Sequence, residues 1–389
     1  MVARSGLLVM HPQVVYSTGV RLKGGGIGNI AYHAIRSLYR HHMLARVLCS
    51  SAAAVEIPAA YLQQWGWISR ALRRAALYDR YGVLDYIHSV LYDLWARKHI
   101  PPGEIFYGWN TFVLRSLSSA KAQGYITFVE RASTHPLYQY RILKEEHATW
   151  GVPLRLHKWA LSRSLQEIHS ADFVVIPSEF VRDTFREQGF PEAKLVQVAF
   201  GVDSRLFYPA PNFSRDVFRV LFVGQVDLRK GIMYLLEAWK QLAWKDAELW
   251  VVGKIPTHMQ ELLTAYKHIS NIKWMGYVRH LAATYRACDV FAFPSLEEGS
   301  ALVTYEAMAC GLPLVVTRNA GSLVRDGVEG FIVPIRDVGA ICDRLEQLRA
   351  SPRLRRHMGA AARRRVEKYT WDAYGDVLCR QIAERVTLT

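Results

Sequence analysis

The feature that most constrains this sequence is a series of short, continuously apolar runs that end near Gly, Pro, Ser or a charged residue. Such runs occur at residues 6–12, 125–131, 172–178, 219–225, 248–254, 289–295 and 312–318. Because they are unbroken and rich in β-branched residues, they predict strands that are buried on both faces of a parallel sheet. Between them, stretches such as 28–42 and 231–243 repeat apolar residues at helical spacing. This alternation predicts an α/β protein with doubly wound parallel sheets.

The length of 389 residues is enough for two or three domains. The segment FYPAPNFSRD at 207–216 holds two prolines, an Asn and a Ser between two strand–helix series. We therefore expect one Rossmann-like domain at 1–210 and a second at 211–370, each of ordinary domain size. The residues at 352–386 predict two helices that are broken near Tyr369, so that 371–389 forms a separate C-terminal helix.

The chain is basic, with 49 Lys and Arg against 34 Asp and Glu and a formal charge of +15. Residues 1–100 carry 12 of the basic residues and only 4 of the acidic ones. Such a charge favours an anionic partner, either nucleic acid, anionic lipid or a phosphorylated substrate. The stretch 61–100 interleaves aromatic residues with arginines, a pattern that can lie on an anionic membrane surface. The alternative is a set of ordinary helices with solvated arginines.

Several classes of protein are excluded by composition. The five cysteines lie far apart and none are spaced as Cys-x-x-Cys, so neither a disulfide framework nor a zinc knuckle is expected. The apolar run at 6–10 is shorter than the roughly 7–15 residues of a secretory signal, and no uncharged apolar run reaches the ~18 residues of a membrane span. We expect a cytoplasmic protein, with peripheral attachment at the inner face of the membrane as a further hypothesis.

Four glycines in the loop RLKGGGIG at 21–28 precede a predicted helix. Ligands of α/β proteins bind beyond the carboxyl ends of the parallel strands, so loops of this kind are candidate sites. Gly26 and Gly28 could let the backbone approach an anion at the helix N-terminus. The pattern is neither a dinucleotide fingerprint nor a P-loop. A flexible surface turn is the alternative.

Two cations, Arg229 and Lys230, stand between the predicted strand at 219–225 and the helix that begins near Gly231. Cations at a helix N-terminus are locally unfavourable, so their presence there indicates a bound anion such as a diphosphate. The alternative is a solvated Arg–Lys pair at a helix start.

Two carboxylates, Glu298 and Glu306, flank the start of a mostly apolar helix predicted at 301–309. A carboxylate within such a helix needs a partner or a ligand hydroxyl, because an unpaired buried charge is costly. The backbone N–H groups of residues 299–302 could bind a phosphate. The alternatives are a solvated turn carboxylate at Glu298 and a structural salt bridge at Glu306.

Together these segments resemble the retaining glycosyltransferases of family 4, which have the GT-B fold. Glu298 and Glu306 match the Glu-x7-Glu motif of that family within PSLEEGSALVTYEAMACGLPLVVT at 294–317. VGQVDLRKG at 223–231 matches its phosphate-binding segment, and PSEFVRDTF at 177–185 and GVDSRLFYP at 201–209 match the segments that close its first domain. The resemblance is strong over about 170–375. It implies two domains that face each other across a cleft, with the C-terminal helix crossing back onto the first domain.

The resemblance implies an enzyme that moves a sugar, with retention and without a metal or other cofactor, from a UDP- or GDP-linked donor to a glycan or lipid-linked acceptor, as in polysaccharide biosynthesis. His135, in ERASTHP at 130–136, occupies the place of a sugar-contacting histidine. Together with Lys230 at the diphosphate and Glu298 at the sugar hydroxyls, it is a candidate catalytic residue. The implied donor-binding residues, with Glu306 on the ribose hydroxyls, are Gly26, Gly28, Arg229, Gly299, Ser300, Ala301, Leu302 and Glu306.

Two departures from the family pattern leave the donor open. Gln225 stands where the family usually has Arg, and 319–327 lacks an acidic residue that relatives often carry after a Gly-Gly pair. Two other functions stay open as well. One is another GT-B enzyme, such as a nucleotide-sugar epimerase or a phosphorylase. The other is a basic nucleic-acid-binding protein, although no recognisable nucleic-acid module is present.

Overall fold

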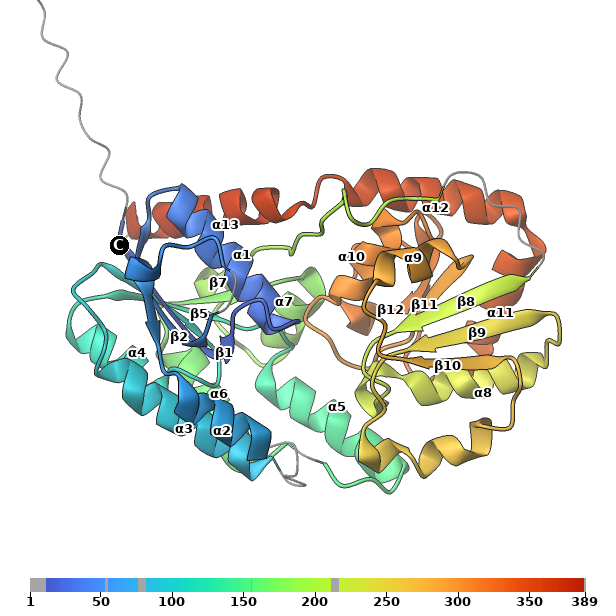
Figure 1. Ribbon diagram of the computed structural model, residues 1–389, viewed down its shortest axis with the longest axis horizontal. Coiled ribbons are helices and arrows are strands. Elements are labelled where there is room, and N and C mark those ends of the chain that lie inside the picture. The colour runs from blue at the N-terminus through green and yellow to red at the C-terminus, as the bar shows by residue number, and fades with distance from the viewer. Residues whose placement is uncertain (1–11, 53–54, 76–81, 155, 211–216, 388–389) are drawn as a thin grey trace, which may run out of the picture. The chain divides into compact units, whose positions relative to one another are not determined.

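Two parallel sheets with flanking helices make up the fold (Figure 1). The computed structural model describes residues 12–387, apart from 53–54, 76–81, 155 and 211–216. The first sheet has the strand order β3-β2-β1-β4-β5-β6-β7, and the second has the order β10-β9-β8-β11-β12-β13. β1 pairs in parallel with β2 and β4, and β8 with β9 and β11. The predicted α/β class with parallel sheets is confirmed.

The elements up to β7 alternate strands with helices. The strands are β1 (Val14–Arg21), β2 (Leu44–Ser51), β3 (Leu62–Gln64), β4 (Ile105–Trp109), β5 (Ile126–Glu130), β6 (Phe173–Ile176) and β7 (Leu195–Gln197). The helices are α1 (Ile27–Arg40), α2 (Trp67–Ala75), α3 (Val83–Arg97), α4 (Leu114–Ala122), α5 (Pro136–Thr149), α6 (Lys158–Ser170) and α7 (Glu179–Arg186).

The same alternation continues around the second sheet. Its strands are β8 (Phe218–Val223), β9 (Ala247–Val252), β10 (Ile272–Gly276), β11 (Val290–Phe293), β12 (Leu314–Thr317) and β13 (Gly330–Val333). The helices are α8 (Ile232–Leu242), α9 (Leu281–Arg286), α10 (Leu302–Ala309), α11 (Val338–Ala350), α12 (Pro352–Val366) and α13 (Trp371–Thr387). A short 3₁₀ helix, η4 (Leu228–Lys230), follows β8.

The chain divides into two compact units. Unit 1 comprises Met1–Glu130, Leu156–Val175 and Gly375–Thr389, and unit 2 comprises Arg131–Arg155 and Ile176–Tyr374. Unit 2 therefore takes in residues 131–155 and 176–210 in addition to the predicted second domain. The predicted boundary segment 207–216 lies largely at 211–216, outside the described residues, and the predicted domain limits stay predictions.

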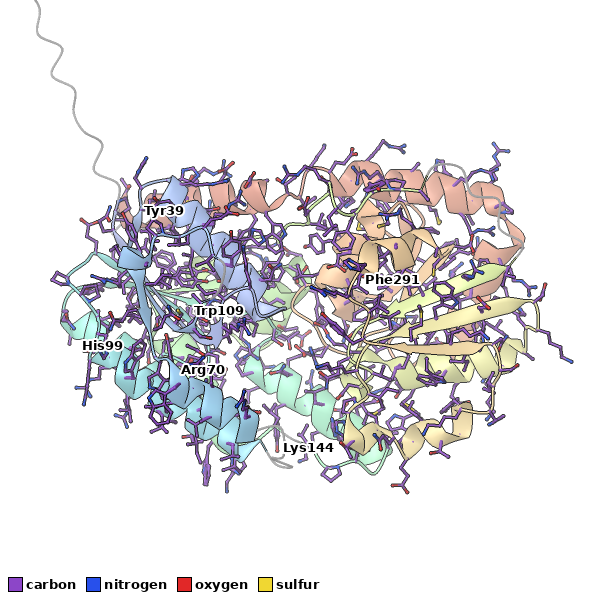
Figure 2. All side chains as sticks on the ribbon, viewed as in Figure 1. Tyr39, Arg70, His99, Trp109, Lys144 and Phe291 are labelled. Atoms are coloured by element: carbon purple, nitrogen blue, oxygen red, sulfur yellow. The ribbon has the colours of Figure 1, made fainter. Side chains whose placement is uncertain are left out.

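Continuous burial explains why the apolar runs were informative. Every residue of β11 and β12 is buried, and so are the last four residues of β8, at the centre of the second sheet. Phe291 in unit 2 and Trp109 in unit 1 lie within the two cores (Figure 2). The predicted strands at 125–131, 172–178, 219–225, 248–254, 289–295 and 312–318 correspond to β5, β6, β8, β9, β11 and β12.

Five strands of the first sheet, β1, β2, β3, β4 and β7, lie outside the predicted apolar runs. β1 has the sequence VVYSTGVR, and its central Ser17 and Thr18 are fully buried. Because these two residues are polar, the segment does not read as a continuous apolar run, although it forms a strand of the core. The hydroxyls of Ser17 and Tyr92 lie 3.1 Å apart, which satisfies one of these buried groups. The predicted strand at 6–12 lies outside the described residues except for its last residue.

The helices that were predicted most directly are confirmed. α1 and α8 cover the stretches 28–42 and 231–243, and α12 and α13 are separated at 367–370, as the tail pattern predicts. α12 begins with Ser351, whose side chain accepts a hydrogen bond from Leu354, and with proline at the first helical position. In unit 2, α8 packs against α11, and α10 packs against α9 and α12. Among the described residues, no helix combines the length and the apolar character needed to cross a membrane.

Candidate active site

The turn after β8 places two cations at the carboxyl edge of the second sheet. The Asp227 side chain accepts a hydrogen bond from the Arg229 N–H at 3.2 Å, which starts η4. Gly231 ends this turn with a φ of 67°, and a Cβ at this position would lie 1.9 Å from the carbonyl oxygen of Pro294. A glycine is therefore required here. The close approach of Gly231 to Pro294 places Arg229 and Lys230 next to the loop that follows β11.

Carboxylates surround both cations. Glu298 pairs with Lys230, and its Oε1 lies 3.1 Å from Nη1 of Arg229. The same Nη1 donates to the carbonyl oxygen of Glu297 at 3.1 Å and lies 3.4 Å from Oε2 of that residue. Sequence reasoning predicted two cations available to a diphosphate. In the structure Lys230 contacts Glu298, and Arg229 contacts both Glu297 and Glu298. A ligand anion must therefore share or replace these contacts.

Burial and the nearby carboxylates shift the pKa of Lys230 in opposite directions. Burial, together with the neighbouring Arg229 guanidinium, lowers the pKa of Lys230 well below its usual value, whereas Glu297 and Asp227 oppose the shift. The direct contact with Glu298 also favours the charged ammonium.

Glu297 is the site residue that sequence reasoning missed. Its side chain is completely buried, and its carboxylate accepts hydrogen bonds from the segment 133–139. Burial alone would raise its pKa, but the charge of Arg229 and the hydrogen bonds from Ser133 and Thr134 lower the pKa of Glu297 to about 2. The sequence did contain a signal, because Glu297 is a second acidic residue directly before Glu298, in the loop that follows a predicted strand.

The loop 131–135, which carries His135, belongs to unit 2 and contacts the loop that follows β11. A Cβ at Gly299 would lie 2.2 Å from the carbonyl oxygen of Ala132, so this glycine is required by backbone packing. His135 is 2% exposed, its backbone N–H donates to Oγ1 of Thr184 at 3.0 Å, and its ring meets that of Phe185 edge to face. The structure thus brings His135 into the unit that holds Lys230 and Glu298. Its predicted contact with a sugar stays a prediction.

The His135 side chain also begins helix α5. Its Nδ1 accepts a hydrogen bond from the Leu137 N–H at 3.3 Å, and Pro136 occupies the first helical position. Since Nδ1 is an acceptor, the proton of the neutral ring lies on Nε2.

Glu306 lies on α10, half-buried, and is bonded to a tyrosine. The Tyr285 hydroxyl donates to Oε2 of Glu306 at 2.8 Å. Burial raises the pKa of Glu306 to about 7, and the bond from Tyr285 opposes this shift. The structure thus gives Glu306 a tyrosine hydroxyl as its partner, which is a hydrogen bond and not the structural salt bridge of the alternative, and its contact with a ribose stays a prediction.

The backbone at the start of α10 is already partly engaged. The Ala301 N–H donates to the carbonyl oxygen of Ala320 at 3.0 Å, and the buried Ser300 hydroxyl donates to Gly321 at 2.8 Å. The Ser178 hydroxyl donates to the Gly299 carbonyl oxygen at 2.5 Å. These contacts hold the predicted anion-binding segment 299–302 in place, and Leu302 is the first residue of the helix.

In unit 1, the glycine loop lies between β1 and α1, as predicted. Gly26 precedes α1 with a φ of 44°, and a Cβ there would meet nothing within 4 Å. A Cβ at Gly28 would lie 2.1 Å from the carbonyl oxygen of Arg21, so Gly28 is required for the helix to pack on the end of its own strand. Gly26 is the one of the two whose surroundings leave space for a ligand.

A small cavity of about 290 Å³ opens at the carboxyl ends of β8 and β9 in unit 2. Gln225, the departure from the family pattern, lines it, together with Tyr277, a residue that is 74% exposed. The ammonium of Lys254 lies 5.9 Å from the centre of the Tyr277 ring. An exposed aromatic ring beside a cavity can stack on a flat ligand such as a nucleobase.

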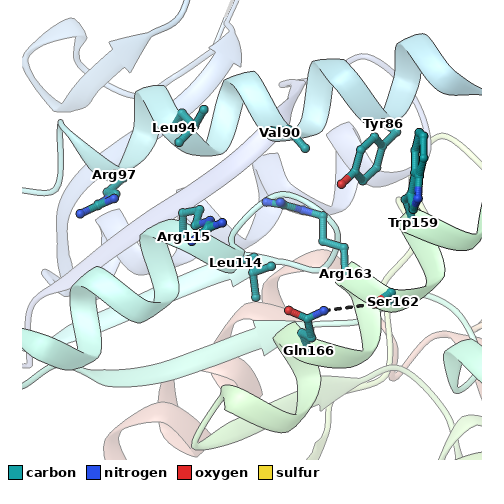
Figure 3. Close-up of a pocket in the computed structure, with 10 residues that line it drawn as sticks. All are labelled: Tyr86, Val90, Leu94, Arg97, Leu114, Arg115, Trp159, Ser162, Arg163 and Gln166. Carbon is teal, nitrogen blue, oxygen red and sulfur yellow. Dashed lines mark hydrogen bonds between the residues drawn. The ribbon is translucent and has the colours of Figure 1, made fainter.

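Unit 1 has a larger groove of about 400 Å³ between α3, α4 and α6 (Figure 3). Figure 3 shows Tyr86 and Trp159 together at one end and the exposed Arg97 and Arg115 towards the other. Arg163 lies beneath them, 5% exposed and paired with the buried Asp93. The groove therefore combines an aromatic end with two solvent-facing cations.

A comparison with known families matches about a third of the chain, the part that carries both cations and the two carboxylates of the predicted motif. Residues 217–351 match the family described as Glycosyl transferases group 1. The matched residues include Arg229, Lys230, Glu298 and Glu306.

Relatives cover a longer part of the chain. The MMP alpha-(1->4)-mannosyltransferase of Mycolicibacterium hassiacum is 30% identical over 258 residues, which span 61% of this chain and 61% of the relative. A GDP-mannose-dependent alpha-(1-6)-phosphatidylinositol monomannoside mannosyltransferase of Mycolicibacterium smegmatis is 29% identical over 244 residues, which span 56% of this chain and 63% of the relative. The chain thus spans about three fifths of the length of these curated relatives.

Solved structures confirm the fold over nearly the whole chain. Sucrose-phosphate synthase of Thermosynechococcus elongatus superposes with a TM-score of 0.73 at 19% identity, covering 97% of this chain and 100% of that structure. At this identity the likeness shows the fold alone. The two parallel sheets with their helices are those of the GT-B fold, and the predicted fold class is confirmed.

Proposed function

We propose that this protein is a retaining, metal-independent glycosyltransferase that moves a sugar from a UDP- or GDP-linked donor to a glycan or lipid-linked acceptor. The observation that carries the proposal is the convergence of Arg229, Lys230 and Glu298 at one sheet edge, within the residues that match glycosyl transferases group 1. The relatives, whose names describe mannosyltransferases, support the same class of reaction.

The proposed chemistry follows from charge. When the bond between the sugar and the diphosphate breaks, negative charge develops on the phosphate and positive charge on the sugar ring. Lys230 and Arg229 would stabilise the phosphate, and the N–H groups around Leu302 would add partial positive charge at the helix start. Glu298 and His135 would contact the sugar, and the diphosphate oxygen itself could take the acceptor proton.

Two other features suit the nucleoside. Glu306 would bind the ribose hydroxyls, and the cavity beside Tyr277 would take the base. Of the two predicted glycines of unit 1, Gly26 has the space for a ligand at the start of α1 and is proposed to contact the donor, whereas Gly28 packs against Arg21. The name of the M. smegmatis relative supports a GDP-linked donor as one candidate, and a UDP-linked donor is the other.

The acceptor is proposed to bind unit 1, which also carries the exposed groups suited to an anionic membrane surface. On α2, Trp67 is 70% exposed and Ile68 is 38% exposed, beside exposed arginines at positions 70 and 74. On α3, Ile87, Leu91 and Leu94 form an exposed apolar row. Within the predicted stretch 61–100, Tyr92 is fully buried and does not reach the surface, and residues 76–81 lie outside the described residues.

Donor binding and turnover test the enzyme proposal. Thermal shift with UDP, GDP and their glucose and mannose conjugates should select one nucleotide, and the selected donor should be hydrolysed slowly in the presence of EDTA. Lys230→Ala should weaken nucleotide binding by roughly 10- to 100-fold, because a hydrogen bond to a charged group is worth about 1.5–3 kcal/mol. Lys240→Ala, on the exposed side of α8, is the matched control. Full binding by Lys230→Ala would contradict the site, and an inverted anomer in the NMR spectrum of the product would contradict retention.

Vesicle flotation tests the membrane proposal. The wild type should float with anionic vesicles and not with neutral ones, and Arg70→Glu with Arg74→Glu should abolish flotation. Two charge reversals at exposed arginines of unit 2, Arg353→Glu with Arg356→Glu, are the control. Equal recovery with neutral and anionic vesicles would overturn this part of the proposal.

A further inference from the structure

Glu297 is a completely buried carboxylate with no role in the proposed chemistry. Its Oε1 accepts hydrogen bonds from the Ser133 hydroxyl at 2.5 Å, the Thr134 N–H at 3.0 Å and the Thr134 hydroxyl at 2.7 Å. Its Oε2 accepts from Nε2 of Gln139 at 3.1 Å. All these donors lie within seven residues of one another, on the loop that ends at His135 and on the first turns of α5.

The same carboxylate faces a cation of the proposed diphosphate site. Nη1 of Arg229 lies 3.4 Å from Oε2 of Glu297 and donates to its carbonyl oxygen at 3.1 Å. A buried charge is tolerated only when it is paired and hydrogen-bonded, and Glu297 has both kinds of partner. One side chain therefore joins two segments that are about 100 residues apart in the sequence.

We propose that Glu297 is a positioning residue that holds the loop 131–135 and Arg229 in the arrangement needed for sugar transfer. The inference rests on the proposed function, because it gives Arg229 the diphosphate and His135 the sugar. The carboxylate holds the loop through Oε1 and the Arg229 guanidinium through Oε2. The positions of the loop and of Arg229 are therefore fixed relative to each other. The loop and Arg229 are thus already in place before the donor binds.

The surrounding backbone supports a single position for this loop. The carbonyl of Ala132 packs on Gly299 so closely that no Cβ would fit. On its other side the loop is held by the bond from the His135 N–H to Thr184. Arg131 and Gln139 bond to Thr134 and Ser133 within the segment itself, and Glu297 connects the segment to the loop after β11. Removal of the Glu297 charge should therefore loosen residues 132–134 while the rest of unit 2 stays folded.

The chain offers a matched control at the far end of the same helix. Glu146 is also completely buried and near an arginine, with Nε of Arg336 at 2.9 Å from Oε2. It accepts from the hydroxyl of Tyr234 and from Nε1 of Trp150, both at 2.8 Å. Glu146→Gln therefore removes a comparable buried charge from α5 without touching the loop or Arg229.

The experiment compares Glu297→Gln, Thr134→Val and Glu146→Gln by donor hydrolysis, nucleotide affinity and amide hydrogen exchange. Glu297→Gln should lower kcat by roughly 10-fold or more, because the carboxylate that joins the loop to Arg229 is lost. The nucleotide affinity should change less than kcat, because the loss of a competing negative charge opposes the loss of a fixed Arg229. Thr134→Val should lower kcat with the nucleotide affinity unchanged. Both should speed exchange at Thr134. Glu146→Gln should lower the Tm while the kcat of the folded enzyme and the exchange at Thr134 stay near the wild type.

Two outcomes would overturn the inference. One is a Glu297→Gln variant with wild-type kcat and wild-type exchange at Thr134, and the other is an equal fall of kcat in Glu146→Gln, which would indicate a general structural effect. Failure of the proposed function is distinguishable, because the wild type would then neither bind nor hydrolyse any nucleotide sugar. In that case the exchange at Thr134 alone decides whether Glu297 holds the loop.

Discussion

The carboxylate of Glu298 binds the ammonium group of Lys230 at the carboxyl edge of the second sheet. Glu298 also lies 3.1 Å from Arg229, so a single side chain opposes both cations that the proposed function assigns to the diphosphate. A nucleotide must share these cations with Glu298 or displace it. The balance between Glu298 and the ligand is therefore expected to set the affinity of the site.

Replacement of Glu298 by Gln should separate binding from transfer. Because the variant removes a negative charge beside the diphosphate, the affinity for the nucleoside diphosphate should rise by roughly 3- to 10-fold. Sugar transfer should fall, since the proposed contact with the sugar is weakened. Calorimetric titration measures the first effect and product formation the second, with the exposed Glu346→Gln as the charge-matched control. Weaker nucleotide binding in Glu298→Gln would contradict the competition.

The pKa of Glu306 predicts a dependence of stability on pH. Burial raises this pKa to about 7, whereas an unfolded Glu titrates near 4.3. Between these values the folded protein holds a proton that the unfolded chain has released, so the stability from this group is present at low pH and is lost as the pH rises towards 7. The free energy of unfolding of the wild type should therefore fall as the pH rises from 5 to 8, and that of Glu306→Gln should not show this fall.

Urea unfolding at the two pH values measures this difference. Glu297→Gln is the control, because the pKa of Glu297 is lowered to about 2 and its charge does not change over this range. A difference between Glu306→Gln and the wild type that is the same at pH 5 and pH 8 would show that Glu306 is not shifted.

His135 has a structural part that can be kept while its ring is removed. Its Nδ1 caps α5 by accepting from Leu137, and an Asn side chain can make the same bond. His135→Asn should keep the Tm close to that of the wild type and lose roughly 10-fold or more in sugar transfer. His135→Ala should lose the cap as well, at a cost of about 1 kcal/mol in stability. Normal transfer by His135→Asn would leave only the capping role.

Gly231 should tolerate no side chain. Its φ of 67° and the 1.9 Å between a built Cβ and the Pro294 carbonyl oxygen predict a loss of more than about 3 kcal/mol in Gly231→Ala. Gly276 has a similar φ of 61° but no atom within 4 Å of its Cβ, so Gly276→Ala should lose only about 1–2 kcal/mol. Equal Tm values for the two variants would show that the close approach at Pro294 carries no energetic cost.

Much of unit 2 was predictable because its signals are local. Strands buried on both faces need continuous apolar residues, and residues 220–223 of β8, all of β11 and residues 314–316 of β12 provide them. The residues after such strands lie at the ligand-binding edge, and the spacing of Glu298 and Glu306 places one before and one after the start of the same helix. β1 was not predicted because its centre carries the buried polar residues Ser17 and Thr18, and the tertiary contact of the Ser17 hydroxyl with the Tyr92 hydroxyl is not visible in any pattern along the chain.

The sequence by itself determined the fold class, the edge of the sheet at which the site lies and the candidate residues on it, because these depend on periodicity and on short motifs. Only the tertiary structure decided how those residues are paired. It placed Glu298 on Lys230, bonded Tyr285 to Glu306, and showed that Glu297 connects Arg229 to Thr134. The physical reason is that the energy of a buried charge depends on partners brought near by folding, and those partners lie 20 to more than 160 residues away along the chain.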